Sequence, residues 1–293
     1  GAAAGLFCSL LALVDAGDEV LLPDPGWSNL VPMTLAAGAR PVFYALDRGA
    51  GFEPDLDAVA KLIGPRTRAI VVNSPGNPTG AVLARDTLGT LTRLAAERGI
   101  WLVSDECYDR LVLDGEHVGA ASTAPEPDGV LTVCSFSKTY AMTGWRVGYV
   151  VAPAPIAALV ARMQEAVLSC PSTPAQKGAE AALAGPQHAV TDMRTAYARR
   201  RDLALAALDA HGVGYVRPRG AFYVMVDISA SGQSSQDFAT ALLAERKVAV
   251  VPGSAFGAQG EGLVRVSFAA PEASIDAGLD LLGQAVEASR RAA

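Results

Sequence analysis

Short apolar runs alternate along this chain with longer segments of helical periodicity, and few folds accommodate such a regular alternation. The apolar runs lie at residues 19–23, 41–46, 69–75, 100–106, 130–135 and 147–153. The helical segments at residues 27–38, 55–64 and 85–99 all end at glycine, and the last two have an aspartate at or near their start, as helix ends favour. Strands that are apolar almost throughout are buried on both faces. The alternation therefore predicts an α/β fold with a mostly parallel, doubly covered sheet.

From residue 154 onwards the pattern changes. Residues 154–169 have helical character, and residues 173–210 form a long alanine-rich helical segment that a glycine-proline pair interrupts. The segments beyond it are strand-like at residues 214–229, 247–257 and 263–270 and helical at residues 235–247 and near the end of the chain. This order is typical of a smaller α+β domain. We therefore expect a large domain at 1–185 and a small C-terminal domain at 186–293, joined by a long helix around 173–210.

The composition excludes several classes of protein. The chain has 293 residues, of which 51% are hydrophobic and 18% are charged, so it can bury a sizeable core. Its formal net charge of -6 argues against a nucleic-acid-binding surface, which needs a concentrated basic patch. It has no run of 18 apolar residues and no basic segment of a secretory signal at its start, so we expect a cytoplasmic protein without a membrane span.

The cysteines and histidines show no spacing of a metal site or a disulfide framework. They are spread along the chain, at Cys8, Cys107, Cys134, Cys170, His117, His188 and His211. We therefore expect no metal site and a reducing compartment.

Polar residues follow three of the apolar runs at the point where each run ends. The sequence NSPGNPTG starts at residue 73, SDECYDR at residue 104 and SFSK at residue 135. The active residues of a parallel α/β sheet gather at the carboxyl ends of its strands, so we expect these three segments to meet. Lys138 of SFSK is the least obvious candidate for an active residue, because a free ammonium has a pKa of about 10.4 and is a poor nucleophile at neutral pH. Taken by itself it would be interpreted as a surface lysine.

Together these segments resemble the class I pyridoxal-phosphate-dependent aminotransferases of fold type I, which are aspartate aminotransferase-like. The resemblance covers nearly the whole chain. Its strongest part is SFSKTYAMTGWRVGY at 135–149, and NPTG, YDRLV, PGSAFG and VRVSFA stand in the expected order. It implies the fold expected above, with pyridoxal 5'-phosphate held by the large domain. The chain begins at the family's phosphate-binding turn, so the resemblance implies that the usual N-terminal segment is lacking.

The resemblance also assigns roles to individual residues around the cofactor ring. Lys138 matches the lysine that forms a Schiff base with the cofactor aldehyde and then moves the α-proton of the substrate. Asp105 matches the carboxylate that keeps the pyridine nitrogen protonated. Tyr108 and Asn77 match the residues that hydrogen-bond the phenolic oxygen. Without the resemblance, Asp105 would be interpreted as a helix cap and Asn77 as a turn residue.

Further residues match the phosphate, ring and substrate positions. Arg146 and Ser135 match phosphate ligands, and Ala2 and Ala3 match the helix N-terminus whose amides face the phosphate. Without the resemblance, small residues at the start of a helix are weak evidence for a phosphate site. The remaining matches are Trp27, whose ring stacks on the cofactor or else belongs to the core, and Arg265, which together with Asn77 binds the substrate α-carboxylate.

The function that follows is transfer of an amino group from an L-amino acid to a 2-oxo acid, in a homodimer. A carbon–sulfur β-lyase is the nearest alternative enzyme, because the same cofactor also supports β-elimination. An alternative of a different class is the aminotransferase-like effector-binding domain of a transcription regulator. The motifs do not fix the amino donor, since aspartate, alanine, aromatic and kynurenine aminotransferases share them, although we favour the aspartate and aromatic group.

Overall fold

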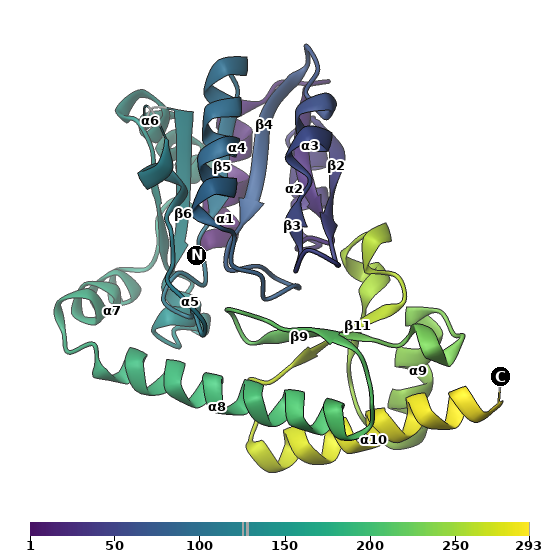
Figure 1. Ribbon diagram of the computed structural model, residues 1–293. Coiled ribbons are helices and arrows are strands. Elements are labelled where there is room, and N and C mark those ends of the chain that lie inside the picture. Colours follow the sequence, from purple (N-terminus) through teal and green to yellow (C-terminus); the bar gives the residue numbers. More distant parts are fainter. Residues whose placement is uncertain (125, 127–128, 293) are drawn as a thin grey trace.

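The computed structural model describes residues 1–124, 126 and 129–292 (Figure 1). Its larger sheet has seven strands in the order β3-β2-β1-β4-β5-β6-β7. These strands are β1 (Glu19–Asp24), β2 (Arg40–Asp47), β3 (Glu53–Pro54), β4 (Thr67–Asn73), β5 (Trp101–Asp105), β6 (Val130–Ser135) and β7 (Gly148–Val151). The pairs β2–β3 and β6–β7 are antiparallel and the other neighbours are parallel. The prediction of an α/β fold with a mostly parallel sheet is confirmed.

Helices cover both faces of this sheet. They are α1 (Ala2–Leu13), α2 (Leu30–Ala36), α3 (Leu56–Leu62), α4 (Arg85–Arg98) and α6 (Ala154–Leu168). Successive residues of β4 point to opposite sides, as the pleat of a strand requires. Ile70 and Val72 belong to a cluster that includes Leu88 of α4, whereas Val71 packs in a cluster with Leu6 of α1. Burial on both faces explains why the strands are apolar almost throughout.

Aspartate lies at or near the start of α3 and α4 as expected, but of the three expected glycine ends only that of α4 is found, since α2 and α3 end at Ala36 and Leu62. The side chain of Asp55 caps α3 by accepting hydrogen bonds from the N–H groups of Asp57 and Ala58. Asp86 lies in the first turn of α4, where a negative charge favours the helix dipole, but Ala84 occupies the cap position. Gly99 ends α4 with a φ of 62°, in the left-handed region that glycine adopts readily.

A second sheet lies in the C-terminal part of the chain. It has four antiparallel strands in the order β10-β11-β9-β8. They are β8 (Tyr215–Val216), β9 (Tyr223–Asp227), β10 (Val251–Pro252) and β11 (Leu263–Ser267). The helices α8 (His188–Ala210), α9 (Ser235–Arg246) and α10 (Glu272–Ala292) accompany it, and Figure 1 shows α8 and α10 lying side by side beneath it. One apolar cluster joins these helices to β9 and β11.

Two expectations for this region need correction. The strand expected at 247–257 is limited to Val251–Pro252, because the chain turns into a 3-10 helix at Gly253, where a Cβ would lie 1.9 Å from the carbonyl oxygen of Gly260. The long helix expected around 173–210 is instead two helices, α7 (Thr173–Ala184) and α8, although the predicted interruption at the glycine-proline pair is confirmed.

The described 3-10 helices are short. They are η1 (Ala120–Thr123), η3 (Thr143–Trp145), η4 (Ser229–Ser231), η5 (Gly253–Phe256) and η6 (Ala258–Gly260). Among the described residues, no helix is both long enough and apolar enough to cross a membrane.

His211, directly after α8, joins this helix to α10. Its Nδ1 lies 2.7 Å from Oε1 of Glu287, and its Nε2 lies 2.9 Å from Oδ1 of Asp280. A Cβ at Gly283 would lie 2.2 Å from Cγ of His211, so only glycine lets the ring rest against α10. The hydrogen bonds to Glu287 and Asp280 raise the pKa of His211 above its ordinary value.

We predict that His211→Gln lowers the free energy of unfolding, by less than about 1 kcal/mol, and mainly at low pH. Because the pKa is raised in the folded state, the stabilisation is complete below the unfolded pKa and is lost as the pH rises through the folded pKa. Urea denaturation of both proteins at about pH 5.5 and about pH 9 measures the difference. An equal difference at both pH values would contradict the assigned role of the imidazolium.

Candidate active site

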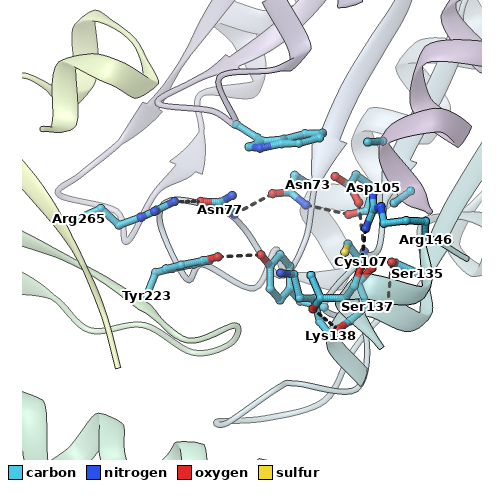
Figure 2. Close-up of a pocket in the computed structure, with 15 residues that line it drawn as sticks. Asn73, Asn77, Asp105, Cys107, Ser135, Ser137, Lys138, Arg146, Tyr223 and Arg265 are labelled. Atoms are coloured by element: carbon cyan, nitrogen blue, oxygen red, sulfur yellow. Dashed lines mark hydrogen bonds between the residues drawn. The ribbon is translucent and has the colours of Figure 1, made fainter. Parts of the chain in front are cut away.

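A cavity of about 310 Å³ lies at the carboxyl ends of β4, β5 and β6 (Figure 2). Its lining contains every residue that the sequence singled out for the site: Ala2, Ala3, Trp27, Asn77, Asp105, Tyr108, Ser135, Lys138, Arg146 and Arg265. It also contains Asn73, Cys107, Ser137, Thr143 and Tyr223. The volume falls in the range of small-molecule sites, which runs from about 300 to 1,000 Å³. The expected residues therefore meet at one place, while their individual roles stay predictions.

Asp105 is the last residue of β5, an interior strand that lies between β4 and β6, and is 5% exposed. Burial raises the pKa of its carboxyl to about 7, against a weaker opposing effect of the hydrogen bond that Oδ1 accepts from the Cys107 N–H at 3.1 Å. None of the ion pairs between described residues includes Asp105. A buried carboxylate in this position favours a cationic ligand.

Asn73 joins the ends of β4 and β5. Its Nδ2 donates to the carbonyl oxygen of Asp105 at 3.0 Å, and its Oδ1 accepts from the N–H of Asn77 at 2.7 Å. The two strands are paired in register at Asn73 and Asp105. The loop that carries Asn77 is thus held beside the buried carboxylate.

Lys138 lies on α5 (Phe136–Thr139), a short helix that directly follows β6. Ser135 caps this helix, since its Oγ accepts a hydrogen bond from the N–H of Ser137 at 3.1 Å. Among the described residues, no hydrogen bond or ion pair involves Nζ of Lys138, which lies 5.6 Å from the centre of the Phe222 ring. The amine is therefore available to a ligand in the cavity that Asp105 also lines (Figure 2).

One wall of the cavity is suited to an anion. The guanidinium of Arg146 lies at the start of α1, where a Cβ at Gly1 would be 3.3 Å from its Nη2, and its Nη1 donates to the carbonyl oxygen of Thr143 at 2.9 Å. Ala2 and Ala3 line the same wall at the N-terminus of α1, whose first amides have no partner within the helix. The guanidinium, the helix N-terminus and the Ser135 hydroxyl together match the chemistry of a phosphate site.

The opposite side of the cavity is closed by Arg265 of β11. Its Nη1 donates to Oδ1 of Asn77 at 2.8 Å, and its Cζ lies 4.4 Å from the ring centre of Tyr223 and 4.9 Å from that of Phe256. Its Nε is buried and has no hydrogen-bond partner among the described residues. Burial lowers the pKa of Arg265, although arginine stays charged in proteins. A buried guanidinium with a free N–H suits a carboxylate ligand.

Trp27 follows β1 and lines the cavity, and it also packs partly against the apolar cluster around α1. The two interpretations of this tryptophan, as a wall of the site and as part of the core, are therefore compatible.

Several residues that line the cavity were not expected from the sequence, for identifiable physical reasons. Asn73 ends β4 and Cys107 stands between Asp105 and Tyr108, so their positions at strand ends could have marked both. Tyr223 gave no such signal, because it opens an apolar strand and reaches the site only through the tertiary fold. Its hydroxyl lies 3.1 Å from that of Tyr108.

We predict that Asp105→Asn stabilises the cofactor-free protein at about pH 8, by up to about 4 kcal/mol, the equivalent of a pKa raised from 3.8 to about 7. The ionised carboxylate destabilises the folded state above its folded pKa, and this effect disappears as the pH falls towards the unfolded pKa. Denaturant unfolding at about pH 8 and about pH 4.5 measures it, with the exposed Asp86→Asn as control. An increase in the free energy of unfolding that is the same at both pH values would contradict the burial of a charge at Asp105.

The comparisons with known proteins give a consistent result. A family model described as aminotransferase class I and II matches residues 1–282. The chain is 41% identical to the probable aspartate/prephenate aminotransferase of Aquifex aeolicus over 98% of this chain and 74% of that protein. It is also 41% identical to an arginine–pyruvate transaminase of Pseudomonas aeruginosa, over 91% and 68% of the two chains. The solved aromatic aminotransferase of Pyrococcus horikoshii superposes with a TM-score of 0.95 at 36% identity, over 98% of this chain and 78% of that chain.

Proposed function

The chain belongs to the class I and II aminotransferases, which are pyridoxal-phosphate-dependent enzymes, and we propose that the cavity at the ends of β4, β5 and β6 is its active site. The protein is an aminotransferase that acts on an amino acid and a 2-oxo acid. One observation carries the assignment of the site. Among the described residues, a buried carboxylate without an ion-pair partner and a lysine amine without a hydrogen-bond partner line the same cavity as an anion-binding wall.

The residues of the cavity fit the cofactor group by group. Asp105 would hold the protonated pyridine nitrogen, because a cation there relieves the cost of its buried charge. Arg146, Ser135 and the amides of Ala2 and Ala3 would hold the phosphate. The residues proposed for the aldehyde, the phenolic oxygen and the ring face are Lys138, Tyr108 with Asn77, and Trp27.

When bound, the cofactor supplies an electron sink that stabilises negative charge at the substrate α-carbon. A cation next to Asp105 would lower the pKa of this carboxyl from about 7, so that it stays ionised and keeps its partner protonated at neutral pH. The amine of Lys138, once free and neutral, would take the proton from the α-carbon of the amino donor and pass it to the cofactor side, so that the donor leaves as a 2-oxo acid and its amino group is retained for the acceptor. Both groups line one cavity, so no movement of the fold is needed to bring them together.

Arg265 would bind the α-carboxylate of every substrate. Its planar fork suits a carboxylate, and the rings of Tyr223 and Phe256 hold the guanidinium plane. The hydrogen bond from Arg265 to Oδ1 of Asn77 leaves the Asn77 amide nitrogen as a donor for another group. The hydrogen bond between Arg265 and Asn77 thereby connects the proposed substrate site with the proposed cofactor contacts.

We propose the division of the chain into a large domain at 1–185 and a small domain at 186–293. The seven-stranded sheet lies within 19–151 and the four-stranded sheet within 215–267, which supports a boundary between them. Lys138 and Asp105 then come from the first domain and Arg265 from the second.

We also propose that the protein is a cytoplasmic homodimer. A second groove, of about 830 Å³, runs beside α1 and α6, and Trp145 and Leu168 in its lining are 50% and 53% exposed. Apolar side chains exposed to this extent favour a contact with a second copy. The four cysteines are unpaired, which supports a reducing compartment. Sedimentation at several concentrations tests the dimer.

For the amino donor, we propose the aspartate and aromatic group, because relatives with these names are 34–42% identical to the chain over the aligned residues. The comparisons do not favour a carbon–sulfur lyase or an effector-binding domain. Formation of 2-oxo acid from a panel of amino donors, with and without an acceptor, tests the reaction and the donor together. Product that forms equally without an acceptor would favour a lyase.

We predict that Lys138→Ala abolishes the borohydride-dependent covalent attachment of the cofactor and lowers turnover by at least about a hundredfold. The reason is that the variant lacks both the bond to the aldehyde and the group that moves the proton. Mass spectrometry after reduction and steady-state kinetics measure the two effects. The control is Lys177→Ala on the exposed face of α7, which should behave as wild type. Cofactor fixed to the Lys138 variant by reduction would overturn the assignment.

We predict that Arg265→Lys lowers kcat/KM roughly 10- to 100-fold for every amino donor, the equivalent of a hydrogen bond to a charged group. Lysine keeps the charge but loses the planar fork, so the carboxylate is held at one point and the Cα–H bond loses its alignment. Cofactor absorbance should change little, and the exposed Arg199→Lys serves as control. Release of the cofactor with unchanged amino-acid affinity would show that the carboxylate role is wrong.

A further inference from the structure

Tyr223 connects two residues of the site that come from different parts of the chain. It is the first residue of β9, it is buried, and it lines the cavity. Its hydroxyl lies 3.1 Å from the hydroxyl of Tyr108, and the guanidinium carbon of Arg265 lies 4.4 Å from its ring centre. In Figure 2 a dashed line marks this hydrogen bond at the hydroxyl group of Tyr223. The side chain thus contacts a proposed cofactor ligand through its oxygen and a proposed substrate ligand through its ring.

The strand register explains how Tyr223 reaches both residues. In the antiparallel pair β9–β11, Tyr223 is opposite Ser267 and Met225 is opposite Arg265. Residues two apart point to the same face of a strand, so Tyr223 and Arg265 are diagonal neighbours on one face of the sheet. Arg265 packs on the Tyr223 ring from this position, and the Tyr223 hydroxyl extends towards Tyr108.

A contact between two hydroxyl groups has a direction. Each tyrosine hydroxyl has one hydrogen, so one of the two donates and the other keeps its hydrogen for another acceptor. Among the described residues, Tyr223 is the one hydrogen-bond partner of the Tyr108 hydroxyl. An anionic oxygen in the cavity would require Tyr108 to direct its hydrogen into the cavity. Tyr223 would then be the donor within the pair.

The charge of Arg265 favours the same direction. A cation over the ring stabilises negative charge on the phenol and so makes the Tyr223 O–H a stronger donor. Successive hydrogen bonds polarise one another, which in turn strengthens the Tyr108 donor. Burial raises the pKa of Tyr108 well above its ordinary value, so this residue keeps its hydrogen at neutral pH.

We propose that Tyr223 is a positioning residue of the transamination reaction: its hydroxyl orients and strengthens the Tyr108 donor to the phenolic oxygen of the cofactor, while its ring holds Arg265 for the substrate carboxylate. This inference rests on the proposed function of the cavity. It assigns two separable effects to one side chain, one through the oxygen and one through the ring.

The test compares Tyr223→Phe, Tyr223→Leu, Tyr108→Phe and the double variant Tyr108→Phe with Tyr223→Phe, each loaded with pyridoxal phosphate. The pH titration of the bound cofactor's absorbance is measured together with kcat and KM. Tyr215→Phe, a change on β8 outside the cavity lining, is the control. Loss of a donor to an anionic oxygen disfavours the anion, so in Tyr223→Phe the apparent pKa of the absorbance change should rise by about half to one pH unit.

The variants should separate the two effects. Tyr223→Phe keeps a ring under Arg265, so KM should stay near the wild-type value while kcat falls roughly three- to tenfold. Tyr223→Leu should show the same absorbance shift and a further rise in KM of about tenfold, because the contact of the cation with the ring is lost. In the Tyr108→Phe background, Tyr223→Phe should add no further shift, because its hydroxyl acts through Tyr108.

An unshifted titration of Tyr223→Phe, or a shift that adds fully to that of Tyr108→Phe, would overturn the inference and leave the proposed function intact. A wild-type protein that shows no cofactor absorbance would overturn both. If Tyr223→Leu fails to fold, the phenylalanine variants still decide the role of the hydroxyl, since phenylalanine fills the same space.

Discussion

A carboxylate buried at the end of an interior strand is costly, and the site of this protein is arranged around one. Asp105 ends β5 between two parallel neighbours, and burial raises its pKa to about 7. A cation that binds beside it recovers part of this cost, which makes the position a strong determinant of how a ligand is oriented. The anion-binding wall at α1 and the amine of Lys138 line the same cavity. A ligand whose cationic ring binds beside Asp105 could therefore place an anionic group at this wall and a further group at Lys138.

The smaller sheet completes the cavity with groups that the larger sheet lacks. Among the described residues, hydrogen bonds at the site join the smaller sheet to the segments that follow β4 and β5, from Arg265 to Asn77 and between the hydroxyl groups of Tyr223 and Tyr108. Asn77 and Tyr108 are proposed to contact the cofactor. Arg265 is proposed to bind the substrate carboxylate, and Tyr223 packs against Arg265. The geometry therefore supports an enzyme in which substrate recognition and cofactor chemistry are coupled through adjacent strands of a small sheet.

The larger part of this organisation could be predicted from the chain because it is local. Apolar runs predicted six of the seven strands of the larger sheet, all except the two-residue β3, and polar residues at the ends of these runs located Asp105 and Lys138. The extent of β10 could not be predicted, since it depends on the close approach of Gly253 to Gly260. The contact of Tyr223 with Tyr108 spans 115 residues, and an apolar strand pattern gives no sign of it. Contacts of this kind follow from the packing of the two sheets.

We propose that one cavity, built around Asp105 and Lys138, holds the cofactor. A crystal structure of the protein grown with pyridoxal phosphate tests this proposal most directly. We expect the pyridine nitrogen within hydrogen-bond distance of Asp105, the phosphate beside Arg146 and the N-terminus of α1, and a covalent bond to Nζ of Lys138. A cofactor bound elsewhere, for example in the groove beside α6, or one in this cavity with its phosphate towards Asp105, would contradict the account.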